Sequence, residues 1–163
     1  TGLIKNNASS PVVNMINLNV LTDYLQQPQF LMRSGKPRHV ILSEQGFTSQ
    51  SHSRGEAEEL QAAAIAYAYY LADSNPLIDA FIMSRQVDAP SEVAASCSFG
   101  LWSCDMSKPN DIVPTMRKQS WTVYKNIDDR KRTLETTEKY KKYIGIEKWS
   151  DVIPDFKWKS QEK

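Results

Sequence analysis

Two apolar segments of the sequence end abruptly in polar side chains that could take part in chemistry. The run "HVILS" is followed by Glu44 and Gln45, and the run "LIDAFIMS" is followed by Arg85 and Gln86. If both runs form parallel strands, their carboxyl ends meet at one edge of a sheet, where ligands bind in such folds. A carboxylate held there by a rigid strand could act as a nucleophile or a general base. The sequence therefore predicts a candidate site around Glu44.

Other polar side chains near these strand ends are weaker candidates. Arg85 and Gln86 could bind hydroxyl groups or orient the neighbouring carboxylate, and a structural salt bridge across the strand ends is an equal alternative for Arg85. Asp88 and Glu92 follow in a polar loop. Acidic residues in such loops are more often solvated turn residues than catalysts.

The histidines and cysteines form no pattern specific for a metal or a catalytic pair. His52 could reach a pocket, although a surface position is favoured, and His39 at the start of its strand is expected to be structural. Cys97 and Cys104 are separated by six residues and lack the C-x-x-C spacing of a structural zinc site. A local disulfide and free thiols both stay open. We expect neither a metal nor an organic cofactor.

Periodicity and end signals predict the helices that position these residues. A first helix is expected around Val20–Leu25 and is limited by Pro28. The clearest helix covers 53–73. Ser53 and Glu56 have capping-box spacing there, and an apolar stripe recurs at i, i+4 and i+7.

The second half of the chain reads as a loop followed by helices. Residues 86–113 are rich in Ser, Pro and Asp and are expected to form a long loop. Pro114 suits the first turn of a helix that runs to Ile127. A charged helix is expected at 133–143, with Gly145 as its C-terminal cap.

Composition excludes several function classes. The charges nearly cancel, with Lys+Arg 20 against Asp+Glu 19, so no basic field favours nucleic acid. The chain has no run of about 18 apolar residues that would span a membrane. It also has no glycine-rich phosphate loop, which argues against a nucleotide.

The alternation of strand and helix predicts a parallel sheet joined by a crossover helix. Two strands make too small a sheet to be stable alone, so the chain is expected to be part of a larger fold. A small self-sufficient α/β domain, for example flavodoxin-like, is the alternative, and its weakness is the number of strands.

Several motifs in combination resemble a known enzyme class. "HVILSEQGF" is followed by an alanine-rich helix, "IDAFIMSRQVD", "FGLW" and "KQSWTVYKNI". This order, over 12–128, resembles the C-terminal part of retaining (β/α)₈ glycoside hydrolases whose catalytic glutamates end strands four and seven. It is most similar to a group of bacterial barrel proteins of uncharacterised activity.

The resemblance implies an α/β fold in which the chain is the C-terminal portion of a (β/α)₈ TIM barrel. Residues 1–128 would hold about strands seven and eight with their flanking helices. Residues 129–163 would be a charged helix and a tail that pack on the barrel exterior. The remaining N-terminal part of the barrel, from the same precursor or a second chain, would be a partner. Barrels of this kind that degrade polysaccharides are usually exported to the periplasm or the medium.

The same resemblance implies retaining hydrolysis of an oligo- or polysaccharide, with Glu44 as the nucleophile and no cofactor. The isolated chain would be inactive, because the acid/base would come from the missing N-terminal part. The implied substrate ligands around Glu44 are Gln45, Arg85, Gln86, Asp88 and Trp102.

The sequence departs from this pattern in two respects. No Asn-Glu dipeptide supplies the acid/base, which should lie about 5–5.5 Å from the nucleophile. "SRQ" replaces the tryptophan that commonly forms the floor of the sugar site, and Trp102 could serve instead. A non-catalytic carbohydrate-binding or scaffold protein is therefore the competing hypothesis.

Overall fold

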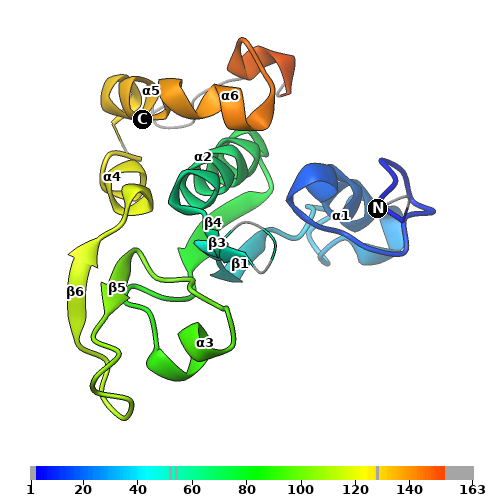
Figure 1. Ribbon diagram of the computed structural model, residues 1–163. Helices are drawn as coiled ribbons and strands as arrows, with labels where there is room; N and C mark the ends of the chain where they lie inside the picture. Colours follow the sequence, from blue (N-terminus) through cyan, green and yellow to red (C-terminus); the bar gives the residue numbers. More distant parts are fainter. Residues whose placement is uncertain (1–2, 52, 54, 128, 153–163) are drawn as a thin grey trace.

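The computed structural model describes residues 3–152 except 52, 54 and 128 (Figure 1). The α-helices are α1 (Leu18–Leu25), α2 (Glu58–Ser74), α3 (Pro90–Ala94), α4 (Gln119–Lys125), α5 (Arg130–Thr137) and α6 (Lys141–Ile144). The strands are β1 (Val40–Gln45), β2 (Gln50–Ser51), β3 (Gly55–Glu56), β4 (Ile78–Met83), β5 (Trp102–Cys104) and β6 (Pro114–Arg117). Short 3₁₀ helices are η1 (Met15–Asn17), η2 (Pro28–Phe30), η3 (Glu138–Tyr140) and η4 (Trp149–Asp151).

The two apolar runs form β1 and β4, which pair in parallel with Val40 opposite Ile78 and Leu42 opposite Phe81. Helix α2 connects them and covers one face of the pair (Figure 1). The predicted strand–helix–strand unit is therefore confirmed. The strands are not covered on both faces within the described residues, because Ile41 is 60% exposed and Ile82 is 46% exposed.

The mixed α/β class is correct, but the expected segment of a (β/α)₈ barrel is wrong. Among the described residues the sheets have two strands each: the parallel pair β1–β4 and the antiparallel pairs β2–β3 and β5–β6. A barrel is built from parallel strands that alternate with helices. Here β4 is followed instead by an antiparallel hairpin, since the backbone of β5 pairs with β6.

Helix α2 forms the centre of the main core. Its alanines at 62, 63 and 66 are buried and let neighbouring elements approach its backbone closely. Helix α4 packs beside it, and the segment of α5, η3 and α6 lies over it (Figure 1). The charged segment that begins near 129 thus shares this core, to which it contributes Tyr140 and Trp149. Residues 153–163 of the predicted tail lie outside the described residues.

Two predicted helix starts are wrong for the same physical reason. Glu56 forms part of β3, whose backbone pairs with β2, so α2 begins only at Glu58 and no Ser53–Glu56 capping box forms. Pro114 begins β6, because that backbone pairs with β5, and α4 begins at Gln119. Long-range strand pairing overrides a local helix signal in both places. The predicted cap at Gly145 is confirmed, with φ of 79° in the left-handed region that glycine favours.

Tyr70 gives the fold a testable dependence on pH. Its ring is fully buried, and its hydroxyl lies 3.0 Å from Thr137 Oγ1. Burial, with the nearby charges of Asp73 and Glu138, raises the pKa of Tyr70 to about 12, although the Thr137 hydrogen bond acts in the opposite direction. Because the folded state binds this proton more tightly than the unfolded state, the stability it contributes is complete below pH 10. That stability is lost as the pH rises toward 12.

We expect wild-type protein to lose up to about 3 kcal/mol of unfolding free energy through Tyr70 over this range. Urea unfolding at several pH values from 8 to 11.5 would measure the loss. Tyr70→Phe should show a shallower fall with pH. Burial also raises the pKa of Tyr67 and Tyr140, so the difference between the two curves isolates Tyr70. Identical slopes would contradict the prediction.

Candidate functional site

A polar pocket of about 490 Å³ lies at the carboxyl ends of β1 and β4. Glu44 enters it from the end of β1, and Ser84 and Arg85 enter from the residues after β4. Glu92 comes from α3. Gly46 and Phe99 complete the lining. The strand ends predicted from the sequence thus do meet, and they form a pocket that contains two carboxylates and a guanidinium group.

The pairing of the two strands positions Glu44. The Ser84 backbone N–H donates to the Gln45 carbonyl at 2.8 Å, which joins the strands just beyond the carboxylate. The register shifts between Leu42 and Gln45, so the strand is irregular at Glu44. The Glu44 side chain is exposed and makes no hydrogen bond or ion pair within the described part of the chain. Its oxygens are therefore available to a ligand.

Arg85 binds Glu92 and makes no ion pair with Glu44. Its Nε lies 3.2 and 3.1 Å from the two carboxylate oxygens, and its Nη2 donates to Oε1. The hydrogen bond and the charge of Glu92 raise the pKa of Arg85 further above its already high value, so the guanidinium stays charged. Its Nη1 has no partner among the described residues. The salt bridge expected across the strand ends does not form among the described residues, and Arg85 pairs with a residue of α3 instead.

Sequence reasoning set Glu92 aside as a loop residue, and it missed Phe99. Glu92 belongs to a short helix that begins at Pro90, in the first-turn position that proline favours. Proline at 90 and an acidic residue at 92 are both typical of the first turn of a helix, so these two residues could have predicted α3. Phe99 lies close to Gly46, where an added Cβ would come within 3.5 Å of the ring. The Phe99 segment therefore packs against the end of β1.

Asp88 was expected to contact substrate, but it lies in a buried polar network behind the pocket. It is 2% exposed, and its carboxylate lies 2.6 Å from Lys118 Nζ, which is buried as well. Lys118 also donates to Ser49 Oγ at 2.9 Å and to Ser98 Oγ at 2.8 Å. The Gly100 N–H donates to the second Asp88 oxygen at 2.6 Å. Asp88 therefore fixes the segment that carries Glu92 and Phe99.

Gln61 connects this network to the start of α2. The side chain is fully buried, and its amide group donates to the carbonyls of Phe47 and Gly100 at 2.9 and 3.1 Å. Its carbonyl oxygen accepts from Ser120 Oγ at 2.8 Å. All the polar atoms of this buried amide are thereby satisfied, as buried amides require. Phe47 and Gly100 directly follow the lining residues Gly46 and Phe99, so both of these segments of the pocket are bound to α2.

The other predicted substrate ligands lie outside the pocket. Gln45 pairs with Met83 at the strand end, and Gln86 lines a separate pocket beside Trp121. Trp102 packs edge-on against Trp121, with ring centroids 6.4 Å apart, and the Arg117 guanidinium lies 4.9 Å from its centroid. Phe99 is the aromatic side chain that lines the pocket with Glu44.

Both cysteines are free thiols. Burial raises the pKa of Cys104, which makes it a poor nucleophile at neutral pH.

His39 lies at the amino end of β1, at the opposite end of the strands from the Glu44 pocket. Its Nδ1 lies 2.7 Å from Oδ1 of Asp79, near the amino end of β4. His52 lies outside the described residues. No group of three or more metal-binding side chains occurs in the described part of the chain. No described helix is long and apolar enough to cross a membrane.

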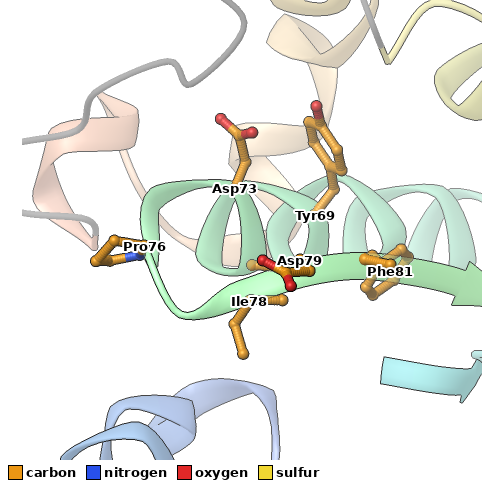
Figure 2. A pocket seen from close by; sticks show the side chains of 8 residues that line it. Tyr69, Asp73, Pro76, Ile78, Asp79 and Phe81 are labelled. Atoms are coloured by element: carbon orange, nitrogen blue, oxygen red, sulfur yellow. The ribbon is translucent and has the colours of Figure 1, made fainter. Parts of the chain in front are cut away.

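A different pocket, at the amino end of β4, contains two further carboxylates (Figure 2). Figure 2 shows that Asp73 and Tyr69 on α2 point away from β4, while the side chain of Asp79, a residue of β4, stays next to the strand. The carboxylates of Asp73 and Asp79 therefore do not converge on one point. Because ligands bind at the carboxyl ends of parallel strands, the pocket around Glu44 is the better candidate.

Comparison with known proteins gives one result. The model of a family described as "Family of unknown function (DUF5722)" matches residues 1–152. None of the curated proteins and none of the solved structures matches the chain.

Proposed function

The chain belongs to this family of unknown function, and we propose that its pocket at the ends of β1 and β4 binds a carbohydrate. We further propose that Glu44 is the nucleophile of a retaining glycoside hydrolysis. The observation that carries the proposal is the unpaired carboxylate of Glu44 in a polar pocket that Arg85, Glu92 and Phe99 also line.

The lining suits a sugar ring. Charged and hydroxyl groups from Glu92, Arg85 and Ser84 can exchange hydrogen bonds with sugar hydroxyls. The Phe99 ring offers an apolar surface for the C–H face of the ring. A volume of about 490 Å³ falls in the range of small-ligand sites.

The proposed reaction has two steps. A Glu44 carboxylate oxygen attacks the anomeric carbon, while the bond from that carbon to the leaving oxygen breaks with its electron pair. The leaving oxygen takes up a proton. Water then attacks the anomeric carbon of the glycosyl ester and gives one proton back to the group that protonated the leaving oxygen. The bond from that carbon to Glu44 breaks with its electron pair, which releases the carboxylate and yields a sugar of the original configuration.

Glu92 is poorly suited to donate the proton. Both of its oxygens accept hydrogen bonds from the Arg85 guanidinium, an arrangement that stabilises an ionised carboxylate. We therefore assign protonation of the leaving group to a partner polypeptide. The isolated chain is expected not to turn over ordinary glycosides.

The test uses reagents whose leaving group needs no protonation. Purified chain is incubated with 2,4-dinitrophenyl 2-deoxy-2-fluoro glycosides of the gluco, galacto and manno series. Intact mass spectrometry should show addition of one fluoro-sugar, and peptide fragmentation should locate it on Glu44. Glu44→Gln should slow labelling by at least about 10³-fold, because an uncharged amide is a much weaker nucleophile than a carboxylate.

The matched control is Glu56→Gln, which alters an exposed glutamate on β3 outside the pocket. It should label at the wild-type rate. Labelling at another residue, or equal labelling of wild type and Glu44→Gln, would remove Glu44 from the nucleophile role.

The competing function is non-catalytic carbohydrate binding, and the Arg85–Glu92 ion pair favours it. An ion-paired Glu92 binds hydroxyls well and leaves the pocket without a proton donor among the described residues. In that case titration with oligosaccharides gives saturable binding, while none of the fluoro-sugar reagents labels the chain.

A further inference from the structure

A second pocket adjoins the Glu44 pocket and shares Arg85 with it. It has a volume of about 360 Å³, and Gln86, Trp121, Tyr124 and Lys125 line it along with Arg85. No acidic side chain lines this pocket among the described residues, whereas Glu44 and Glu92 line its neighbour. The two cavities therefore present opposite charge on either side of one guanidinium.

The positive charge of Lys125 in this second pocket is not neutralised within the described part of the chain, whereas Arg85 is paired with Glu92. Lys125 is exposed, makes no ion pair there, and has its Nζ 5.1 Å from the centroid of the Trp121 ring. The Arg117 guanidinium lies 4.1 Å from the same ring and also lacks a carboxylate partner there. Cation–π contacts of this kind hold the two cations near the pocket without cancelling their charge.

The remaining lining suits a sugar better than a bare ion. The Gln86 side-chain amide can both donate and accept hydrogen bonds. Tyr124 adds an aromatic surface, and Met83 and Leu101 add apolar contacts. Arg85 Nη1 has no partner among the described residues, because Nε and Nη2 are the atoms that bind Glu92.

We propose that this second pocket is a subsite for an anionic sugar, whose carboxylate or sulfate group is bound by Lys125 and Arg85. This inference rests on the proposed function and names its substrate class, an acidic oligosaccharide. The neutral sugar unit, or the unit at which cleavage occurs, would lie beside Glu44, and a charged unit would lie beside Lys125. Arg85, in the wall between the pockets, would contact both units.

The test measures binding to the full chain by NMR and needs no reaction at Glu44. The probes are methyl β-glucuronide, glucose 6-sulfate and the neutral methyl β-glucoside, and the readout is the indole N–H signal of Trp121. We expect the acidic probes to bind at least about tenfold more tightly than the neutral one, because charge-assisted hydrogen bonds are stronger than neutral ones. Their affinity should fall as salt is added. A preference between the two acidic probes identifies the anionic group.

Lys125→Gln should weaken binding of the preferred acidic probe by about tenfold. The matched control is Lys142→Gln, since Lys142 lies 4.9 Å from the Tyr143 ring in a similar cation–π contact on α6, away from the pocket. It should leave the affinity unchanged. Equal affinity for acidic and neutral probes, an unchanged affinity in Lys125→Gln, or equally tight binding of inorganic sulfate would each overturn the subsite.

Failure of this inference can be distinguished from failure of the hydrolase proposal. Labelling of Glu44 by a neutral fluoro-sugar depends on the first pocket alone, and equilibrium binding of an acidic monosaccharide depends on the second. Acidic-sugar binding without labelling removes the nucleophile role and leaves the subsite. Labelling without any preference for acidic probes removes the subsite and leaves the nucleophile role.

Discussion

Replacing Lys118 by methionine is expected to lower the free energy of unfolding by about 3–5 kcal/mol. The substitution keeps most of the apolar stem but leaves the buried Asp88 carboxylate, 2.6 Å from Nζ in the native pair, without its counter-charge. A domain of this size is stable by only about 5–15 kcal/mol, so the variant should unfold at much lower urea concentration. Chemical denaturation followed by tryptophan fluorescence would measure the loss.

A second variant separates the ion pair from simple packing. Lys118→Met combined with Asp88→Asn removes both charges, so it should be more stable than Lys118→Met alone. Arg132→Met is the control for an exposed pair, since Arg132 lies 3.7 Å from Asp129 at the surface and should cost less than about 1 kcal/mol. A Lys118→Met variant as stable as wild type would show that Asp88 tolerates burial without Lys118.

Gly100→Ala is expected to cost about 3 kcal/mol or more, at the upper end of overpacking substitutions. An alanine Cβ would lie 2.3 Å from the Asp88 nitrogen and 2.7 Å from the Trp102 carbonyl oxygen. Both are backbone atoms, so the two segments would have to move apart. Because Gly100 also donates its N–H to Asp88, the segment with Glu92 and Phe99 should shift with it.

Gly46→Ala is the matched control for this substitution. Its Cβ would meet Ser84 Oγ at 2.9 Å, but that atom ends a short side chain that can rotate away. We expect a loss of unfolding free energy well below that of Gly100→Ala. Urea unfolding of both variants makes the comparison, and equal losses would argue against backbone crowding as the cause at Gly100.

Part of the candidate site followed from the sequence because local patterns encode it. An apolar run that ends at Glu44, an alanine-rich helix and a second apolar run that ends at Arg85 predict a parallel pair whose carboxyl ends meet. The structure has that pair, with Glu44 and Arg85 in one pocket. Periodicity and abrupt polar ends lie within a few neighbouring residues, so they can be read without knowledge of the fold.

The roles of the loop residues after β4 could not be read in that way. Asp88 and Glu92 are both acidic residues in the same polar stretch, yet one is buried against Lys118 and the other faces the pocket. What separates them is contact beyond their immediate neighbours in the chain: Asp88 pairs with Lys118 on another element, and Glu92 pairs with Arg85, seven positions before it. Local sequence carries no signal for such pairings.

Local sequence patterns are enough to predict the strand–helix–strand unit, the carboxylate at the end of its first strand and the glycine cap at Gly145. Each of these depends on interactions between near neighbours or on a simple period. Tertiary structure alone decided that β4 leads into an antiparallel hairpin rather than a barrel, and that Glu92 and Phe99 join Glu44. The physical reason is that buried hydrogen bonds from Asp88, Lys118 and Gln61 set the course of that segment, and these join residues far apart in the chain.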